Sequence, residues 1–255
     1  FTIQYVIGGS HYTSLNNQQL YSLIEYALLI DTVGTDIFIL NQPYNSDQIS
    51  HLVSRNKKHA IFNSIYDYSK IENSNNINVR VKPQVIMFSS NQDRSIYNSI
   101  ELDGVISISD ASFVNEIELG NSFKLDSTFH GDKSEWLMGY FSSSYGIFKT
   151  KSLQIFSGRI SRNFGALNDY GLILSNNPFA FDHFGFSAYN KKIQYSFYAT
   201  RLNDVSGEDI QGVIIPIDSI SNSKRFWAIQ RLDYKINQKL QMAFTEATIY
   251  GGPDQ

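Results

Sequence analysis

Residues 100–109, IELDGVISIS, alternate between apolar and polar side chains, with a break only at Gly104 and Val105. One set is apolar and the other is polar or acidic: Ile100, Leu102, Ile106 and Ile108 against Glu101, Asp103, Ser107 and Ser109. Successive side chains of an extended strand point to opposite faces. The stretch therefore predicts a β-strand with one apolar face and one polar, partly charged face.

The same period of two recurs on both sides of this stretch, in residues 79–88, 123–129, 193–200 and 231–235. Segments of this kind fit a transmembrane β-barrel, whose apolar face meets lipid and whose polar face lines the lumen. They also fit a soluble antiparallel β-sandwich, in which the apolar faces form a closed core. The pattern alone leaves both architectures open.

The barrel interpretation makes a prediction about each face. We expect one set to point outward: Val79, Val81, Ile106, Ile108, Ile193, Tyr195 and Phe197. We expect a second set to share the concave face: Arg80, Lys82, Glu101, Asp103, Lys124 and Asp126.

The first part of the chain has a helical period instead. Apolar residues in 18–30 recur at helical spacing, Ser46 is a good N-cap with Asp47 in the first turn, and residues 57–71 continue the spacing. We therefore divide the chain into an N-terminal segment of short helices, residues 1–76, and antiparallel strands, residues 77–255. Leu23, Leu52 and Ile65 are expected to be buried in the helical unit.

Composition excludes several classes of function. The net charge of −3 gives no electrostatic case for nucleic acid, and the absence of cysteine rules out disulfides and thiolate sites. There is no apolar run long enough for a transmembrane helix. The chain starts at Phe1, within a possible signal-peptide tail or trimmed end, and stops at residues 251–255 with no closing element, so we expect a fragment at both ends.

Residues 158–187, GRISRNFGALNDYGLILSNNPFAFDHFGFS, interrupt the strands with glycine, asparagine and arginine. We expect residues 159–177 to form a polar turn or an inward-folded loop. Arg159, Arg162 and Asp182 form the sharpest polar cluster, either as an arginine–carboxylate brace or as a ligand contact. Glu246 is expected to pair with Arg231 or Arg159 inside the barrel.

Catalytic and metal sites are not indicated. The five histidines lack His-x-x-x-His spacing and an accompanying Glu, so we expect no metal, no cofactor and no catalytic residue. Glu101 and Asp103 share a strand face, where lumen-facing solvated acids explain them better than glycosidase chemistry.

The order of the features resembles the Wzi-type capsule assembly family of outer-membrane proteins. The resemblance rests on LYSLIEYALLI, LNQPYNSDQISHLV, SGRISRNFGALNDYGLILSNNPFAFDHFGFS and RFWAIQRLDYKINQKLQMAFTEATIYGG, which follow one another over most of the chain. The matching positions are Gly158, Arg159, Gly165, Leu174, Ser175, Asn177, Pro178, Phe179, Arg231, Leu232, Phe244, Glu246, Gly251 and Gly252. The chain departs from the family at Phe164, where a tryptophan is usual, and at Gln230, where a histidine is usual.

This resemblance implies a mostly β fold: an incomplete antiparallel transmembrane β-barrel in the bacterial outer membrane, preceded by a small helical unit that plugs or caps its periplasmic side. It implies a non-enzymatic protein that binds or organises capsular or extracellular polysaccharide and contacts outer-membrane lipid. The residues to which we assign polysaccharide contact are Arg159, Arg162, Asp182, Arg231 and Glu246. An outer-membrane hydrolase of lipid or glycan and a soluble β-sandwich carbohydrate-binding module are the alternatives.

Overall fold

The computed structural model describes residues 11–13, 15, 18–30, 37–55, 60, 62, 65, 77–89, 94–121, 138–165, 171, 173–175, 180–202, 224–237 and 240–252. The helices are α1 (Gln18–Ile30) and α2 (Ser46–Arg55), and residues 60, 62 and 65 are also helical. The strands are β1 (Ile77–Ser89), β2 (Arg94–Ile108), β3 (Ala111–Gly120), β4 (Met138–Lys149), β5 (Leu153–Ile160), β6 (Phe181–Tyr189), β7 (Ile193–Leu202), β8 (Lys224–Lys235) and β9 (Gln241–Gly252).

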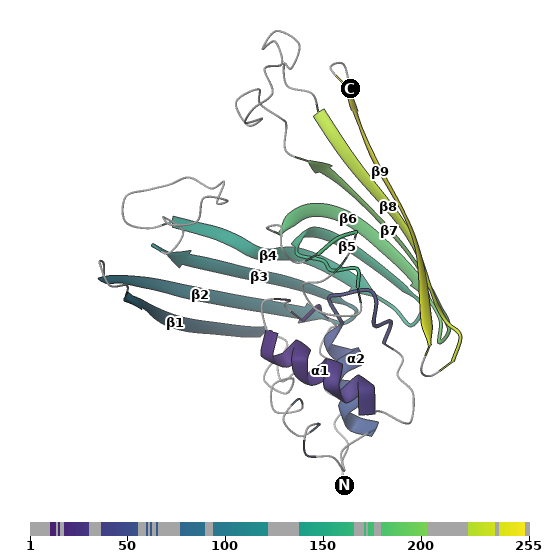
Figure 1. The fold of residues 1–255 in the computed structure, drawn as a ribbon, viewed down its shortest axis with the longest axis horizontal. Coiled ribbons are helices and arrows are strands. Elements are labelled where there is room, and N and C mark those ends of the chain that lie inside the picture. The colour runs from purple at the N-terminus through teal and green to yellow at the C-terminus, as the bar shows by residue number, and fades with distance from the viewer. Residues whose placement is uncertain are drawn as a thin grey trace.

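The nine strands form one antiparallel sheet in the order β1-β2-β3-β4-β5-β6-β7-β8-β9, so each strand pairs with the next one along the chain. The sheet is curved, and the helices lie at one end of it (Figure 1). The prediction of a mostly β, antiparallel fold with few helices is confirmed. None of the described helices is long and apolar enough to span a membrane.

The convex face of the sheet is exposed and carries mainly apolar side chains. Each of the nine strands contributes to it, through Ile77, Val79, Val81, Ile100, Ile106, Ile108, Phe113, Phe141, Phe148, Leu153, Ile155, Phe184, Ile193, Leu232, Tyr234, Met242, Phe244 and Tyr250. Ile106 is 45% exposed and Ile108 is 65% exposed. The outward orientation predicted from the alternation is therefore confirmed for these strands.

The concave face is polar. Glu101 and Asp103 lie on it, as predicted, because they alternate with the exposed residues of β2. The side chains of Arg80 and Lys82, and residues Lys124 and Asp126, lie outside the part of the chain that the structure describes. No second described sheet covers either face, so the closed core that a β-sandwich requires is not found in the described residues.

The helical unit has its own apolar core. Helix α1 contributes Leu20, Ile24 and Ala27, α2 contributes Leu52, and Ile65 is fully buried beside them. Burial of Leu52 and Ile65 confirms the prediction for these two residues, while Leu23 is only half-buried against the core. Helix α1 spans the predicted residues 18–30 and α2 begins at the predicted N-cap, Ser46, whereas most of the predicted helical stretch 57–71 lies outside the described residues.

The two ends of the sheet differ in their connections. At one end the strands are joined by the short segments 109–110, 150–152, 190–192 and 236–240, and the helices lie at this end. At the other end three of the connections are long, namely 121–137, 161–180 and 203–223. The described part of the connection 161–180 folds back onto the concave face, since Asn163 pairs with Gln42 and Phe164 packs with Tyr198 and Ile229.

Candidate functional site

A row of polar side chains crosses the concave face from β4 to β9. The strand registers align Lys149, Gln154, Ser187, Ser196, Arg231 and Thr245. We call these six residues the polar row. Each residue of the row lies directly opposite the next one on the neighbouring strand. The strand register therefore brings together residues that are far apart in the sequence.

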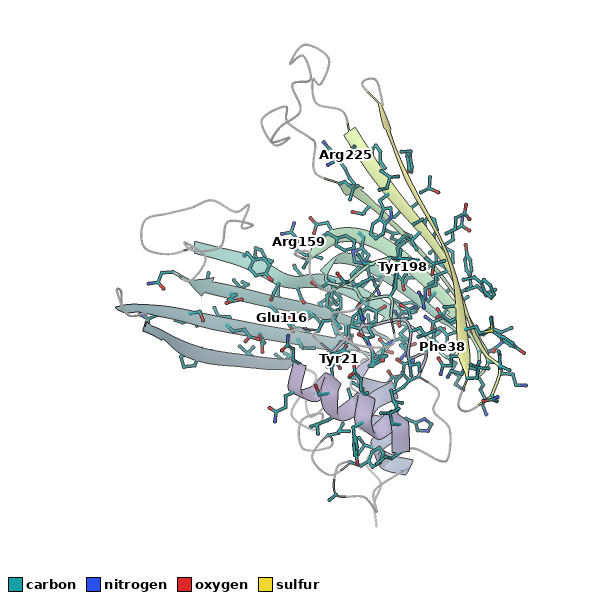
Figure 2. The ribbon with its side chains drawn as sticks, viewed as in Figure 1. Tyr21, Phe38, Glu116, Arg159, Tyr198 and Arg225 are labelled. Atoms are coloured by element: carbon teal, nitrogen blue, oxygen red, sulfur yellow. The ribbon has the colours of Figure 1, made fainter. Side chains whose placement is uncertain are left out.

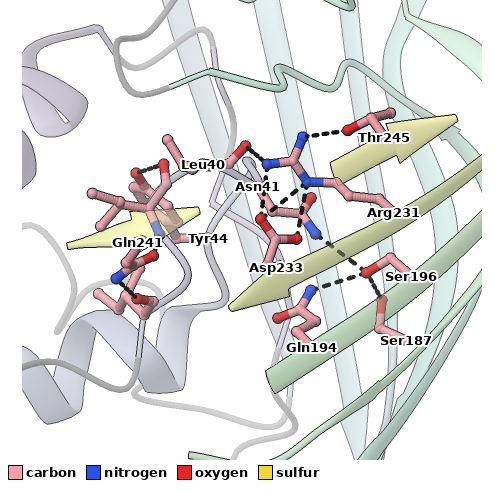
Figure 3. Close-up of polar contacts among 12 residues, drawn as sticks. Leu40, Asn41, Tyr44, Ser187, Gln194, Ser196, Arg231, Asp233, Gln241 and Thr245 are labelled. Carbon is pink, nitrogen blue, oxygen red and sulfur yellow. Dashed lines mark hydrogen bonds and ion pairs between the residues drawn. The ribbon is translucent and has the colours of Figure 1, made fainter. Parts of the chain in front are cut away.

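Residues 37–47, which we call the strap, bind along the polar row. Asp47 of the strap contacts Lys149 at 2.6 Å, and Asn45 donates from Nδ2 to Gln154 Oε1 at 2.9 Å. Further along, Asn41 donates to Ser196 Oγ at 3.3 Å, and the carbonyl of Leu40 accepts from Arg231 at 2.9 Å (Figure 3). The strap therefore attaches the helical unit to the sheet through hydrogen bonds and an ion pair.

Arg231 is the strongest anchor of this interface. Its guanidinium donates to both carboxylate oxygens of Asp233, at 2.8–3.1 Å, and to Thr245 Oγ1 at 3.2 Å. Both side chains of the ion pair are nearly fully buried, at 3% and 2% exposure. Figure 3 shows the guanidinium between the strap and the sheet, with Asn41 and Ser196 beside it.

The predicted partner of Arg231 was wrong. Glu246 pairs in register with Gln230, the neighbour of Arg231 that points to the convex face, so Glu246 lies on the opposite side of the sheet from Arg231. The acid that Arg231 uses is Asp233, two residues along the same strand and therefore on the same face.

The brace predicted for Arg159 is confirmed. Arg159 donates to both oxygens of Asp182, at 3.1 and 2.6 Å, across the β5–β6 pair. However, both residues lie on the convex face and are partly exposed, at 35% and 68%. Arg159 lies an even number of residues from the exposed Leu153 and Ile155 and therefore points to the same face, away from the strap.

The side chain of Arg162 is buried on the concave side of the sheet, with 2% of its surface exposed. Its guanidinium carbon lies 4.2 Å from the ring centre of Tyr198, 4.9 Å from that of Phe156 and 5.1 Å from that of Tyr12. Nε donates to His183 Nε2 at 2.6 Å. Stacking on aromatic rings favours a guanidinium, which is weakly hydrated and planar.

The hydrogen bonds of His183 identify its protonation state. Arginine can only donate, so Nε2 of His183 must accept and carries no proton. The other ring nitrogen, Nδ1, lies 2.9 Å from the carbonyl oxygen of Phe181 and is therefore the donor. His183 is thus a neutral imidazole that orients Arg162 and adds no negative charge to it.

A pocket lies beside Arg162, between the strap and the sheet. Its walls are rich in amides and hydroxyls: Tyr12, Phe38, Asn41, Pro43, Asn45, Gln48, Gln154, Arg162, Ser187, Tyr189, Gln194 and Tyr198. Oδ1 of Asn45 is buried without a hydrogen-bond partner among the described residues. The lining of the pocket is therefore mainly neutral and polar, and Arg162 is the one charged residue among the described residues that form it.

Acidic residues gather elsewhere on the concave face. Glu101 lies opposite Glu118, and Asp103 lies opposite Glu116, in the register of β2 and β3. No group of three or more potential ligands within the described residues is arranged to hold a metal ion.

Sequence reasoning identified one residue of the pocket, Arg162, and missed the others. Tyr12, Asn41 and Asn45 come from the N-terminal segment, where nothing in the local pattern pairs them with strands more than 100 residues away. The uncharged run Asn41-Gln42-Pro43-Tyr44-Asn45 is ordinary in a chain with 18% charged residues, so the local sequence carries no signal for these contacts.

The chain was also compared with models of protein families, with curated proteins and with solved structures. None of the three comparisons finds a match.

Proposed function

We propose that this chain forms part of an outer-membrane β-barrel whose convex face contacts lipid. The observation that carries the proposal is the distribution of side chains in the sheet: apolar residues of all nine strands are exposed outward, while ionised residues such as Arg231 and Asp233 are buried inward. A soluble sheet with one polar face turns that face to water and buries the apolar face. The opposite arrangement suits a lipid environment.

The connections support the same proposal. Transmembrane barrels of this class join their strands by short turns on the periplasmic side and by longer loops on the outside. In this chain the short turns lie at one end, together with the helices, and the segments 121–137, 161–180 and 203–223 lie at the other. The helical unit would then lie at the periplasmic end, with the strap inside the barrel.

The two edge strands of the sheet, β1 and β9, need hydrogen-bond partners if the sheet lies in a membrane. Strand β1 pairs only with β2, and β9 only with β8, among the described residues. Open edges leave backbone amides and carbonyls without partners, which is not tolerated in the hydrocarbon layer. We therefore propose that additional strands join β1 and β9 and close the barrel.

For the biological role we propose binding or organising of surface polysaccharide without catalysis, on the strength of the resemblance to the capsule assembly family. Of the five residues assigned to this role, only Arg162 borders the pocket. Arg231 is committed to Asp233 and the strap, and Arg159, Asp182 and Glu246 lie on the convex face. Polysaccharide contact is therefore better sought on the long-connection side of the concave face.

The two alternatives lack a specific observation in their favour. A soluble β-sandwich module needs Ile106 and Phe197 in a closed core, yet Ile106 is exposed and a single sheet is described. A hydrolase needs a nucleophile–base pair or two carboxylates around a bond. His183 cannot serve as the base of such a pair, because its unprotonated nitrogen Nε2 already accepts a hydrogen bond from Arg162.

The lipid contact can be tested because the chain has no cysteine. Spin labels on Leu102→Cys and Asp103→Cys probe adjacent residues that point to opposite faces of β2. In lipid vesicles we expect the label at residue 102 to collide with oxygen and the label at residue 103 to collide with a water-soluble nickel complex. Equal access of the nickel complex to both labels would refute the membrane assignment.

The polysaccharide role needs a separate measurement. Cells that lack the protein should release more capsular or extracellular polysaccharide into the medium than cells that carry it. Unchanged retention, in cells where the spin labels place the chain in lipid, would remove the polysaccharide role and leave the barrel in place.

A further inference from the structure

Arg162 has a different electrostatic environment from the other buried arginine. Arg231 is neutralised by Asp233 at 2.8 Å. Arg162 is equally buried, and its partners within the described part of the chain are all neutral: His183, Tyr198 and Tyr12, with three aromatic rings around it. A buried charge without a counter-charge is costly, so such a site favours the uptake of an anion.

Some hydrogen-bond donors of Arg162 and of its tyrosine neighbours have no acceptor among the described contacts. A guanidinium has five N–H groups, and the bonds to His183, Tyr198 and Tyr12 use three of them, two at the long distance of 3.5 Å. Tyr12 accepts hydrogen bonds from both Gln154 and Arg162. Burial raises the pKa of the Tyr12 hydroxyl above its usual value, so this group keeps its proton and can donate it.

Tyr198 offers a second hydroxyl proton next to the same guanidinium. Its oxygen accepts from Arg162, and no described contact uses its proton. Two arginine N–H groups and two tyrosine O–H groups thus remain available within one small region. Anions in proteins are commonly bound by just such a combination of a charged donor and neutral donors.

The adjoining pocket limits the size of the guest. All of Tyr12, Arg162 and Tyr198 line it, and none of its lining residues is acidic. Its volume is ≈ 20 Å³, which exceeds the roughly 10–15 Å³ that one water-sized body needs. A sugar ring or a uronic acid is far larger than this space.

We propose that this pocket binds a monovalent anion of halide size, held by Arg162, Tyr12 and Tyr198. The anion neutralises Arg162 and joins the N-terminal segment, through Tyr12, to β7, through Tyr198. The proposal does not depend on the proposed function, because it rests only on the burial of Arg162 and on its neutral partners within the described part of the chain.

The test is thermal unfolding of the purified full chain in detergent, with bromide or chloride titrated against gluconate at constant ionic strength. Gluconate is too large for the pocket and controls for general screening. A halide at ten times its dissociation constant should raise Tm by about 3–6 °C, because it binds only the folded state. The dependence on halide should saturate.

Two variants make the result specific. Arg162→Gln should abolish the halide-dependent rise in Tm, whereas Arg159→Gln, which alters an exposed ion pair on the other face, should retain it. If Arg162→Gln does not fold, crystals of the unaltered protein grown in bromide decide the matter. An anomalous peak is expected within about 3.5 Å of the Arg162 guanidinium, a normal distance for such a contact.

The proposal is wrong if the unaltered protein shows equal Tm in halide and gluconate, or if the bromide crystals show no peak at Arg162. In either case the aromatic rings and neutral acceptors alone accommodate the guanidinium, and water fills the pocket.

Discussion

The two faces of the sheet each carry an arginine–aspartate pair, in opposite surroundings. On the convex face, Arg159 and Asp182 bridge β5 and β6 among exposed apolar residues and are themselves partly exposed. On the concave face, Arg231 and Asp233 are buried under the strap, and Arg231 donates to the strap carbonyl of Leu40 (Figure 3). Figure 2 labels Arg159 on the sheet and Phe38 on the strap. The same two residue types thus serve as a surface brace in one place and as an attachment point between two parts of the chain in the other.

The difference in burial determines what each pair contributes. Arg159 and Asp182 lie at the end of β5 and β6 that leads into the long connection 161–180, where water can screen both charges, so this pair gains little. Removing one partner of a buried pair is costly, because the remaining charge stays desolvated. The concave face should therefore be sensitive to loss of single charges, and the convex face should be sensitive to gain of charge.

The largest effect is expected at Arg231. Arg231→Met removes the guanidinium that binds both oxygens of the buried Asp233 carboxylate, and should lower the free energy of unfolding by about 3–5 kcal/mol. Denaturant unfolding in detergent measures this. The double variant Arg231→Met with Asp233→Leu should recover much of the loss, since the buried carboxylate is removed together with its guanidinium partner. If the double variant is as unstable as the single one, the bonds to Leu40 and Thr245 matter more than the charge balance.

A charge added to the convex face should have the next largest effect. Leu102→Lys, near the middle of β2, should disfavour folding into lipid bilayers by about 2–4 kcal/mol. Ile108→Lys, at the end of β2 beside a short turn, should cost only about 0–1 kcal/mol, because the lysine can reach the interface. The measurement is equilibrium folding into vesicles. Equal effects at both positions would contradict a lipid-facing convex surface.

The backbone of β5 provides a third comparison between the faces. Gly158 has φ 134°, and a Cβ there would lie 2.5 Å from Tyr145 Cα and press on the Ser144 carbonyl oxygen. Gly158→Ala should therefore destabilise the fold by about 1–3 kcal/mol, measured by thermal unfolding. The matched control is Gly146→Ala on β4, where a Cβ would only touch the Phe113 ring at 3.4 Å. A neutral Gly158→Ala would show that β4 and β5 can separate without loss.

The smallest effect is expected at the exposed brace. Arg159→Gln should change the free energy of unfolding by no more than about 1 kcal/mol, as is usual for exposed pairs. The same denaturant titration used for Arg231 measures it. A loss as large as that of Arg231→Met would mean that the convex pair is shielded from water, and would remove the contrast between the two pairs.

Much of the fold could be predicted because it rests on local periodicity. The alternation in 100–109 placed Ile106 outward and Asp103 inward, and helical spacing located α1 and the start of α2 at Ser46. The same alternation also predicts the orientation of Arg159, which lies an even number of residues from Leu153 and Ile155 and so points to the same face. We treated Arg159 as part of the polar loop, although it belongs to the strand, and so expected it on the wrong face.

The sequence by itself determined that a helical start precedes a mostly β remainder, and which face of the strands in 79–88, 100–109, 193–200 and 231–235 is apolar, since these properties depend on neighbours a few residues away. Only the tertiary structure decided which strands lie at which register, and hence that Glu246 faces Gln230 while Arg231 meets Asp233 and the strap. It also decided that Tyr12, Arg162 and Tyr198 surround one pocket. Register and long-range docking depend on hydrogen bonds and packing summed over the whole sheet, and no local pattern of residues encodes that sum.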